Sequence, residues 1–213
     1  MKILLKYGIA HFLLLLSLTF ALIRLTEGFV LTPELFANSG DPLSGMPGQD
    51  AGVLVTLQKW IYISSTVYLM IKLGLITLIL HTALYLFHQS VPLHRVFKIA
   101  VVAEFIFLIP AVIKLGTFSY TYPQGNLLDW HQYYILSALT YFKSVPAAWY
   151  YALQTLNAFE IIYWFLLARG IEHITLMTYD KSLRIVLVSY LPSLLIWIAI
   201  VTFVSLLMYP STG

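Results

Sequence analysis

The sequence predicts an all-α, polytopic membrane protein, a bundle of five transmembrane helices with one short interfacial helix on the outer side. Of its 213 residues, 60% are hydrophobic and only 10% are charged, whereas a typical soluble domain carries about 25% charged residues. Five apolar stretches are each long enough to cross about 30 Å of hydrocarbon as a helix. More polar segments separate these stretches, as in a chain that crosses a bilayer several times.

The five predicted spans are residues 8–31, 56–88, 98–120, 146–169 and 184–208. The first span opens like a secretory signal peptide, but no small-residue cleavage pattern follows its apolar core, so we expect it to be retained. The second span is longer than a perpendicular crossing needs and should tilt or project beyond the bilayer. Pro110 and Pro192 lie inside the third and fifth spans, where a proline removes a backbone hydrogen bond and kinks the helix.

Charged residues are distributed unequally between the two sides of the predicted bundle. If the spans alternate, one side carries the basic residues Lys2, Lys6, Arg95, Lys98, Arg169, Lys181 and Arg184. The other side carries the acidic residues Glu34, Asp41, Asp50 and Asp129. Because basic residues favour the cytoplasmic side, we expect a multi-pass protein of the bacterial inner (cytoplasmic) membrane, with a cytoplasmic N-terminus and an outer C-terminus. The net charge of +3 is spread along the chain, which argues against nucleic acid as a partner.

Two segments connect the spans on the predicted outer side. Residues 32–55 are rich in Gly, Pro, Asn, Asp and Ser, which favours turns, so we expect an outer loop there. Residues 127–143 alternate apolar and aromatic side chains at near-helical spacing, which predicts a helix in the outer headgroup layer. Its aromatic belt would consist of Trp130, Tyr133, Tyr134 and Tyr141. Ser144 and Pro146 are suited to cap and begin the fourth span.

Ionisable residues inside the spans are the candidate functional residues. At 1.5 Å of rise per residue, Glu104, His81 and Glu160 lie about 9, 10 and 13 Å from the cytoplasmic edge, so three helices bring them to one layer. Two carboxylates that share a layer disfavour each other's ionisation, and a nearby imidazole exchanges protons near neutral pH. This layer is therefore a candidate proton or ion site, with the deeper Lys72 as a counter-charge.

A purely structural role for the same residues is the alternative. Each carboxylate would then be neutral, or hydrogen-bonded to a neighbouring Tyr, Ser or His, and would fasten one helix to another. His11 and His81 suggest a further possibility, the bis-imidazole ligation of a b-type haem, which needs one histidine from each of two helices at matching depth.

Several kinds of chemistry have no signature in the sequence. The chain has no cysteine, which excludes disulfides, thiolate metal sites and iron–sulfur ligation. It contains no HExxH, no GxSxG, no Walker lysine loop and no GxGxxG after a strand. We therefore expect a protein that is not an enzyme and that needs no cofactor or metal.

The last two spans and the entry to the third carry a family resemblance. The third span opens with "LHRVFKIAVVAEFIFLIPAVI", and the fourth reads "LNAFEIIYWFLLARGI" before "DKSLR" leads into the last helix. These stretches resemble the bacterial branch of the Yip family of five-span membrane proteins, at Leu156, Asn157, Phe159, Trp164 and Gly170. The resemblance implies a five-span fold and a membrane location, and it implies no reaction.

Three functions remain open at this point. The first is a non-enzymatic, Yip-like scaffold or accessory subunit of a larger membrane complex, with the lipid bilayer and other membrane subunits or itself as partners. The second is a small transporter or channel subunit that uses Glu104, Glu160, His81 and Lys72 as a proton or ion pathway. The third is a haem-binding electron carrier with His11 and His81 as ligands.

Overall fold

The structure is a computed structural model that describes residues 8–32, 35, 38–39, 50–142 and 145–208; for residues 50–58, 147–148 and 208 it describes the backbone alone. The described elements, in chain order, are α1 (Gly8–Phe29), α3 (Asp50–Leu86), α4 (Leu93–Glu104), the 3-10 helix η3 (Phe105–Phe107), α5 (Leu108–Thr121), α6 (Leu127–Gln132), the 3-10 helix η4 (Ala138–Tyr141), α7 (Ala147–Thr155), α8 (Ala158–Ile174) and α9 (Tyr179–Met208). Within this part of the chain, β pairing is limited to one bridge, between Ser137 and Asn157. The predicted all-α class is confirmed.

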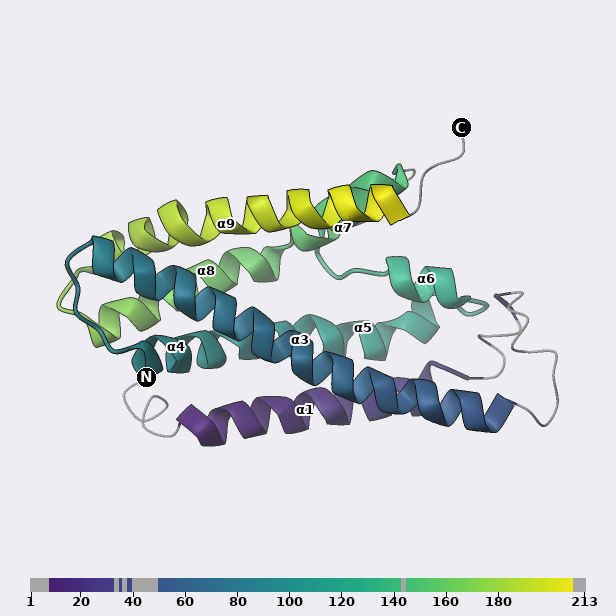
Figure 1. Ribbon diagram of the computed structural model, residues 1–213. Coiled ribbons are helices and arrows are strands. Elements are labelled where there is room, and N and C mark those ends of the chain that lie inside the picture. Colours follow the sequence, from purple (N-terminus) through teal and green to yellow (C-terminus); the bar gives the residue numbers. More distant parts are fainter. Residues whose placement is uncertain (1–7, 33–34, 36–37, 40–49, 143–144, 209–213) are drawn as a thin grey trace.

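In the described part of the chain, four helices are long and apolar enough to cross a membrane. They are Gly8–Phe29, Lys59–Leu86, Leu93–Thr121 and Tyr179–Leu207, and they correspond to the first, second, third and fifth predicted spans. Helix α3 has 37 residues and is therefore about 55 Å long. It runs diagonally across the bundle (Figure 1), as expected for a segment too long for a perpendicular crossing.

The predicted outer loop at residues 32–55 falls largely outside the described residues, as do Lys2, Lys6, Glu34, Asp41 and Ser144. Its end at residue 55 is wrong, because α3 already begins at Asp50. The turn-forming composition ends earlier than predicted, and the apolar stretch after Gly52 continues the helical pattern of the span.

The predicted fourth span, residues 146–169, is not one continuous helix. Helix α7 ends at Thr155 and α8 begins at Ala158, while Leu156 and Asn157 between them have extended backbones. The 17 residues of α8 cover about 25 Å, which is short of a full crossing. The physical reason is Asn157, because an asparagine side chain competes with the helix for backbone hydrogen bonds and starts a new helix as its cap.

The predicted interfacial helix at residues 127–143 is also broken. It consists of α6, a non-helical stretch at residues 133–137 with a turn at residues 135–136, and η4. The end of this stretch and the start of η4 pair with the break between α7 and α8. The Ala138 amide donates to the Leu156 carbonyl at 2.8 Å, and the Ala158 amide donates to the Leu136 carbonyl at 3.1 Å. Each irregular segment therefore satisfies backbone groups that the other leaves unpaired.

The buried core lies at one end of the bundle, where α3 ends, α4 begins, α8 ends and α9 begins (Figure 1). We call this the basic end, because its residues include Arg95, Lys98, Arg169, Lys181 and Arg184. The core side chains there include Leu80, Leu84, Val96, Ile99, Leu167, Ile171 and Ile185. Helices α8 and α4 approach closely, since a Cβ atom added at Gly170 would collide with the Ile99 side chain. The bundle is thus tightly closed at its basic end.

The third predicted span is helical throughout but changes its winding near its middle. Helix α4 ends at Glu104, and the 3-10 turn η3 leads into α5. Pro110 lies just after this turn and has no amide hydrogen to donate to the carbonyl of Ile106, one turn earlier. The change of winding places Glu104 at the end of α4.

Candidate functional site: a charged cavity beside the helix break

A cavity of about 760 Å³ lies between α3, α4–α5, α8 and α9, on the side of the core away from the basic end. This volume is in the usual range for small-molecule sites, about 300–1,000 Å³. Most of its wall is apolar. Its polar and charged lining residues include Lys72, Glu104, Lys114, Tyr134, Ser137, Tyr151, Gln154, Thr155, Asn157, Glu160, Tyr190 and Ser193.

Lys72 of α3 and Glu104 of α4 form an ion pair in the wall of the cavity. The Lys72 Nζ atom lies 2.5 Å from Glu104 Oε1, and the two side chains are 22% and 7% exposed. The same ammonium lies 4.0 Å from the centroid of the Phe107 ring and 5.7 Å from that of Tyr163. Ring faces are electronegative, so aromatic side chains and one carboxylate together stabilise the lysine charge.

Glu160 lies in the first turn of α8 and is 5% exposed. Its Oε1 atom accepts hydrogen bonds from the Tyr190 hydroxyl at 2.7 Å and from Trp164 Nε1 at 3.1 Å. Its amide donates to the Asn157 side chain at 2.8 Å. A carboxylate at this position is also stabilised by the positive end of the helix dipole. The second carboxylate oxygen accepts no hydrogen bond within the described residues. One oxygen of Glu160 is therefore free to accept a hydrogen bond from a ligand or water.

Two further polar atoms near the Lys72–Glu104 pair are buried without a hydrogen-bond partner in the described structure. They are Oε2 of Glu104 and the hydroxyl of Tyr163, whose ring lies against Phe107 and Tyr190. An unsatisfied buried polar group costs about 1–3 kcal/mol, and such groups in a native fold often mark a functional site. They lie on α4 and α8, so both helices bring unsatisfied polar groups to this level.

The opposite end of the cavity holds a second lysine. Lys114 Nζ of α5 lies 4.3 Å from the centroid of the Trp130 ring and 4.9 Å from that of Tyr134. No carboxylate of the described residues lies within ion-pair distance of it. Trp130 of α6 and Tyr134 just after it therefore contact a cation in the wall of the cavity.

The structure brings together three of the four predicted site residues. Lys72, Glu104 and Glu160 all line the cavity, and we refer to them as the charged cluster. His81 does not line it; nine residues further along α3, it lies about 13 Å closer to the basic end. The depth predicted for His81 rested on straight helices perpendicular to the membrane. Helix α3 is instead strongly inclined (Figure 1).

The predicted haem ligands are not part of this cavity. Neither His11 on α1 nor His81 on α3 is among its lining residues. The described residues contain no group of three or more His, Cys, Asp or Glu side chains arranged to hold a metal ion. Haem ligation by two histidines stays a prediction from sequence.

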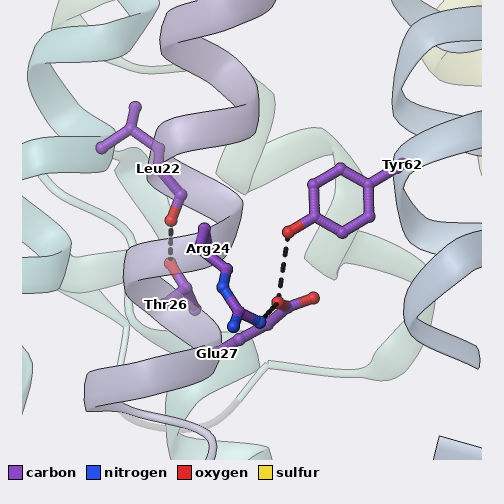
Figure 2. Close-up of polar contacts among 5 residues, drawn as sticks. All are labelled: Leu22, Arg24, Thr26, Glu27 and Tyr62. Atoms are coloured by element: carbon purple, nitrogen blue, oxygen red, sulfur yellow. Dashed lines mark hydrogen bonds and ion pairs between the residues drawn. The ribbon is translucent and has the colours of Figure 1, made fainter. Parts of the chain in front are cut away.

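Sequence reasoning missed a buried carboxylate near the end of α1. Glu27 is 6% exposed in its side chain, and its Oε2 atom accepts hydrogen bonds from Arg24 Nη1 at 3.3 Å and from the Tyr62 hydroxyl at 3.2 Å (Figure 2). The other oxygen, Oε1, is buried and has no partner within the described residues. The spacing of Arg24 and Glu27, three residues apart on a helix, is the signal that could have found the pair. The contact with Tyr62 fastens α1 to α3.

Asn157 connects the two halves of the broken helix, and its replacement gives a first prediction. Its Oδ1 atom caps α8, and its Nδ2 atom donates to the carbonyls of Gln154 and Thr155 at the end of α7. Asn157→Ala should lower the free energy of unfolding by about 0.5–2 kcal/mol, the usual value of an N-cap. Unfolding in mixtures of mild detergent and SDS measures this loss. Asn157→Ser keeps a capping oxygen and is the control; equal stability of the two variants would contradict the capping role.

No protein-family model, curated protein or solved structure matches the chain. The fold and the site therefore define its class on their own: in its described residues, an all-α protein with four helices long and apolar enough to cross a membrane and a charged cavity between helices. The resemblance to the Yip family stays a prediction. Its five residues all lie in the break or in α8: Leu156, Asn157, Phe159, Trp164 and Gly170.

Proposed function

We propose that the protein is a small, non-enzymatic membrane transporter or channel subunit that moves protons or another ion through the cavity. The observation that carries this proposal is the charged cluster, because Lys72, Glu104 and Glu160 come from three different helices and line one cavity. A charged side chain at the centre of a membrane helix costs about 2.5–3.5 kcal/mol even on the lenient insertion scale. Such residues therefore indicate a pathway for ions or protons before any other role.

The break between α7 and α8 supports the same proposal. Discontinuous helices form the ion and substrate sites of many transporters, where free backbone groups and helix ends point at the ligand. Here Thr155 and Asn157 at the break line the cavity, one turn from Glu160. Extended backbone at membrane depth persists only where protein or water satisfies its polar groups, and the cavity supplies room for water.

The direction of the chain is part of the proposal. Helices α7 and α8 both pack along α9, so that together they would make the fifth crossing of the predicted five-span bundle. The positive-inside rule assigns the basic end to the cytoplasm. In a bacterial inner membrane the N-terminus would then be cytoplasmic, the C-terminus outside, and the cavity on the outer side of the buried core.

Replacing Glu160 by glutamine tests the transport function. The amide side chain would keep an oxygen to accept from Tyr190 and Trp164, but it carries no charge and takes up no proton. Glu160→Gln should therefore abolish proton or cation flux, measured as the response of a pH-sensitive or cation-sensitive dye inside proteoliposomes.

The matched control is Glu172→Gln. Glu172 pairs with Arg169 at the basic end, at 2.5 Å and partly exposed, so that its replacement removes a carboxylate outside the cavity and should leave flux unchanged. Equal flux in the parent protein and in Glu160→Gln would refute a pathway through Glu160.

A Yip-like scaffold or accessory subunit is the second candidate, and one observation favours it. The same polar contacts also fasten helices: Lys72–Glu104 joins α3 to α4, and Tyr190–Glu160 joins α9 to α8. Buried polar contacts of this kind are a normal means of helix association in membranes. Unaltered or absent flux in the proteoliposome experiment would leave this as the supported function, with other membrane subunits or a second copy as partner.

A further inference from the structure

The cavity has an open side between α3 and α9. These two helices are close near the basic end and diverge away from it (Figure 1). Ile71 and Leu75 of α3 line the cavity and are 54% and 43% exposed; Ile196 and Ile200 of α9 line it from the other edge and are 62% and 52% exposed. Apolar side chains this exposed on membrane-crossing helices belong to the surface that acyl chains contact. The cavity therefore opens sideways toward lipid.

One ammonium in the cavity wall has no carboxylate partner among the described residues. Of the two lysines in the wall, Lys72 is neutralised by Glu104, whereas Lys114 has only the Trp130 and Tyr134 rings as described partners. Glu160 of α8 already accepts hydrogen bonds from Trp164 and Tyr190. An ammonium in a mainly apolar wall, stabilised by ring faces alone, is well placed to accept an anionic group.

The two ends of the cavity are separated along α4–α5. Glu104 and Lys114 are ten residues apart, which corresponds to about 15 Å. The wall between them includes Phe107, Pro110 and Ala111. An elongated ligand with one charged end fits this arrangement better than a compact, evenly polar one.

We propose that the cavity binds an anionic amphiphile. Its carboxylate or phosphate would lie on Lys114 Nζ, and its acyl chain would lie along Ile71, Leu75, Ile196 and Ile200 and pass between α3 and α9 into the bilayer. This inference rests on the proposed transport function, because it names the class of molecule that the cavity carries, while the charged cluster remains the proton or ion site.

Binding of labelled amphiphiles to the full chain tests this inference. The protein is placed in nanodiscs of phosphatidylcholine, and radiolabelled palmitate, lysophosphatidic acid and hexadecanol are titrated separately. Palmitate or lysophosphatidic acid should bind saturably, with one site per chain, and hexadecanol should bind at least 10-fold more weakly, because it lacks the charge. Whichever of the two anions binds more tightly shows whether the ligand is a fatty acid or a phosphate lipid. Equal binding of hexadecanol and palmitate would overturn the proposal.

Variants of the lysine make the test specific. Lys114→Met should weaken the binding of the anionic probe at least 10-fold, Lys114→Arg should retain it, and Lys59→Met, at an exposed lysine outside the cavity, should leave it unchanged. Full binding of the anionic probe by Lys114→Met would overturn the placement of its charged group on Lys114.

If no amphiphile binds while Glu160→Gln still abolishes ion flux, the amphiphile inference fails and the proposed function stands. If amphiphiles bind through Lys114 while Glu160→Gln leaves flux unchanged, the ion pathway fails instead.

Discussion

Replacing Lys72 by methionine should lower the free energy of unfolding by about 3–5 kcal/mol, the typical cost of removing one partner of a buried ion pair. Methionine keeps most of the side-chain volume, so that the loss reports on charge. Without the ammonium, Glu104 is left with Oε2 already unsatisfied and with Oε1 newly deprived of its partner. The carboxylate must then stay charged in a low-dielectric site or take up a proton, and either change costs free energy.

A double-mutant cycle separates the pair from the packing around it. The free energy of unfolding is measured in mixtures of mild detergent and SDS for Lys72→Met, Glu104→Gln and the double variant. The double variant should be more stable than Lys72→Met alone, because it removes the uncompensated charge as well as its partner. A loss below about 1 kcal/mol for Lys72→Met would be the value of an exposed ion pair, and it would contradict the burial of this one.

Gly170→Leu should have the second large effect, a loss of about 3 kcal/mol or more. A Cβ atom at this position would already collide with Cγ2 of Ile99, and leucine adds three more carbons. Extra carbons in a tightly packed core typically cost about 1–3 kcal/mol, occasionally more. Because Gly170 is the point where α8 contacts α4, the two helices would have to separate at the basic end.

Shortening the opposing side chain tests whether this contact is the cause. Ile99→Ala in the Gly170→Leu background should recover part of the lost stability, although Ile99→Ala alone is destabilising. Gly74→Leu is the matched control, since nothing lies within 4 Å of a Cβ atom added at Gly74. Thermal unfolding in detergent compares the variants. The close contact would be disproved if Gly170→Leu were as stable as Gly74→Leu.

The sequence predicted the class of the fold because long apolar stretches are sufficient evidence for membrane helices. It did not predict the break at Leu156 and Asn157, because two residues hardly change the average hydropathy of a 24-residue window. The hydrogen bonds that make the break stable come from residues 136–138, and no local pattern reports such a pairing. One local signal was present: Asn157 precedes Glu160 by three residues, which is the spacing of a capped helix start inside an apolar run.

The candidate site was predicted in part for a similar reason. Glu104 and Glu160 could be placed near one another by counting rise, because both lie on helices that enter from the same end. His81 was assigned to the same layer by the same count, but the inclination of α3 brings Lys72 there instead. The contribution of Lys114 was missed. A lysine near the end of a membrane helix usually extends its side chain so that the amine reaches the membrane interface, which explains the residue without any further role. The position of Trp130 and Tyr134 beside its ammonium became visible only in the structure.

The backbone pairing of residues 136–138 with residues 156–158 also bears on how the chain enters the bilayer. If α7 and α8 moved into lipid alone, the amide of Ala158 and the carbonyl of Leu156 would lose the partners they have in the folded protein. Each such orphan costs several kcal/mol in hydrocarbon. If α7 and α8 form the fifth crossing as proposed, this helical pair should therefore enter the bilayer favourably only together with residues 136–138.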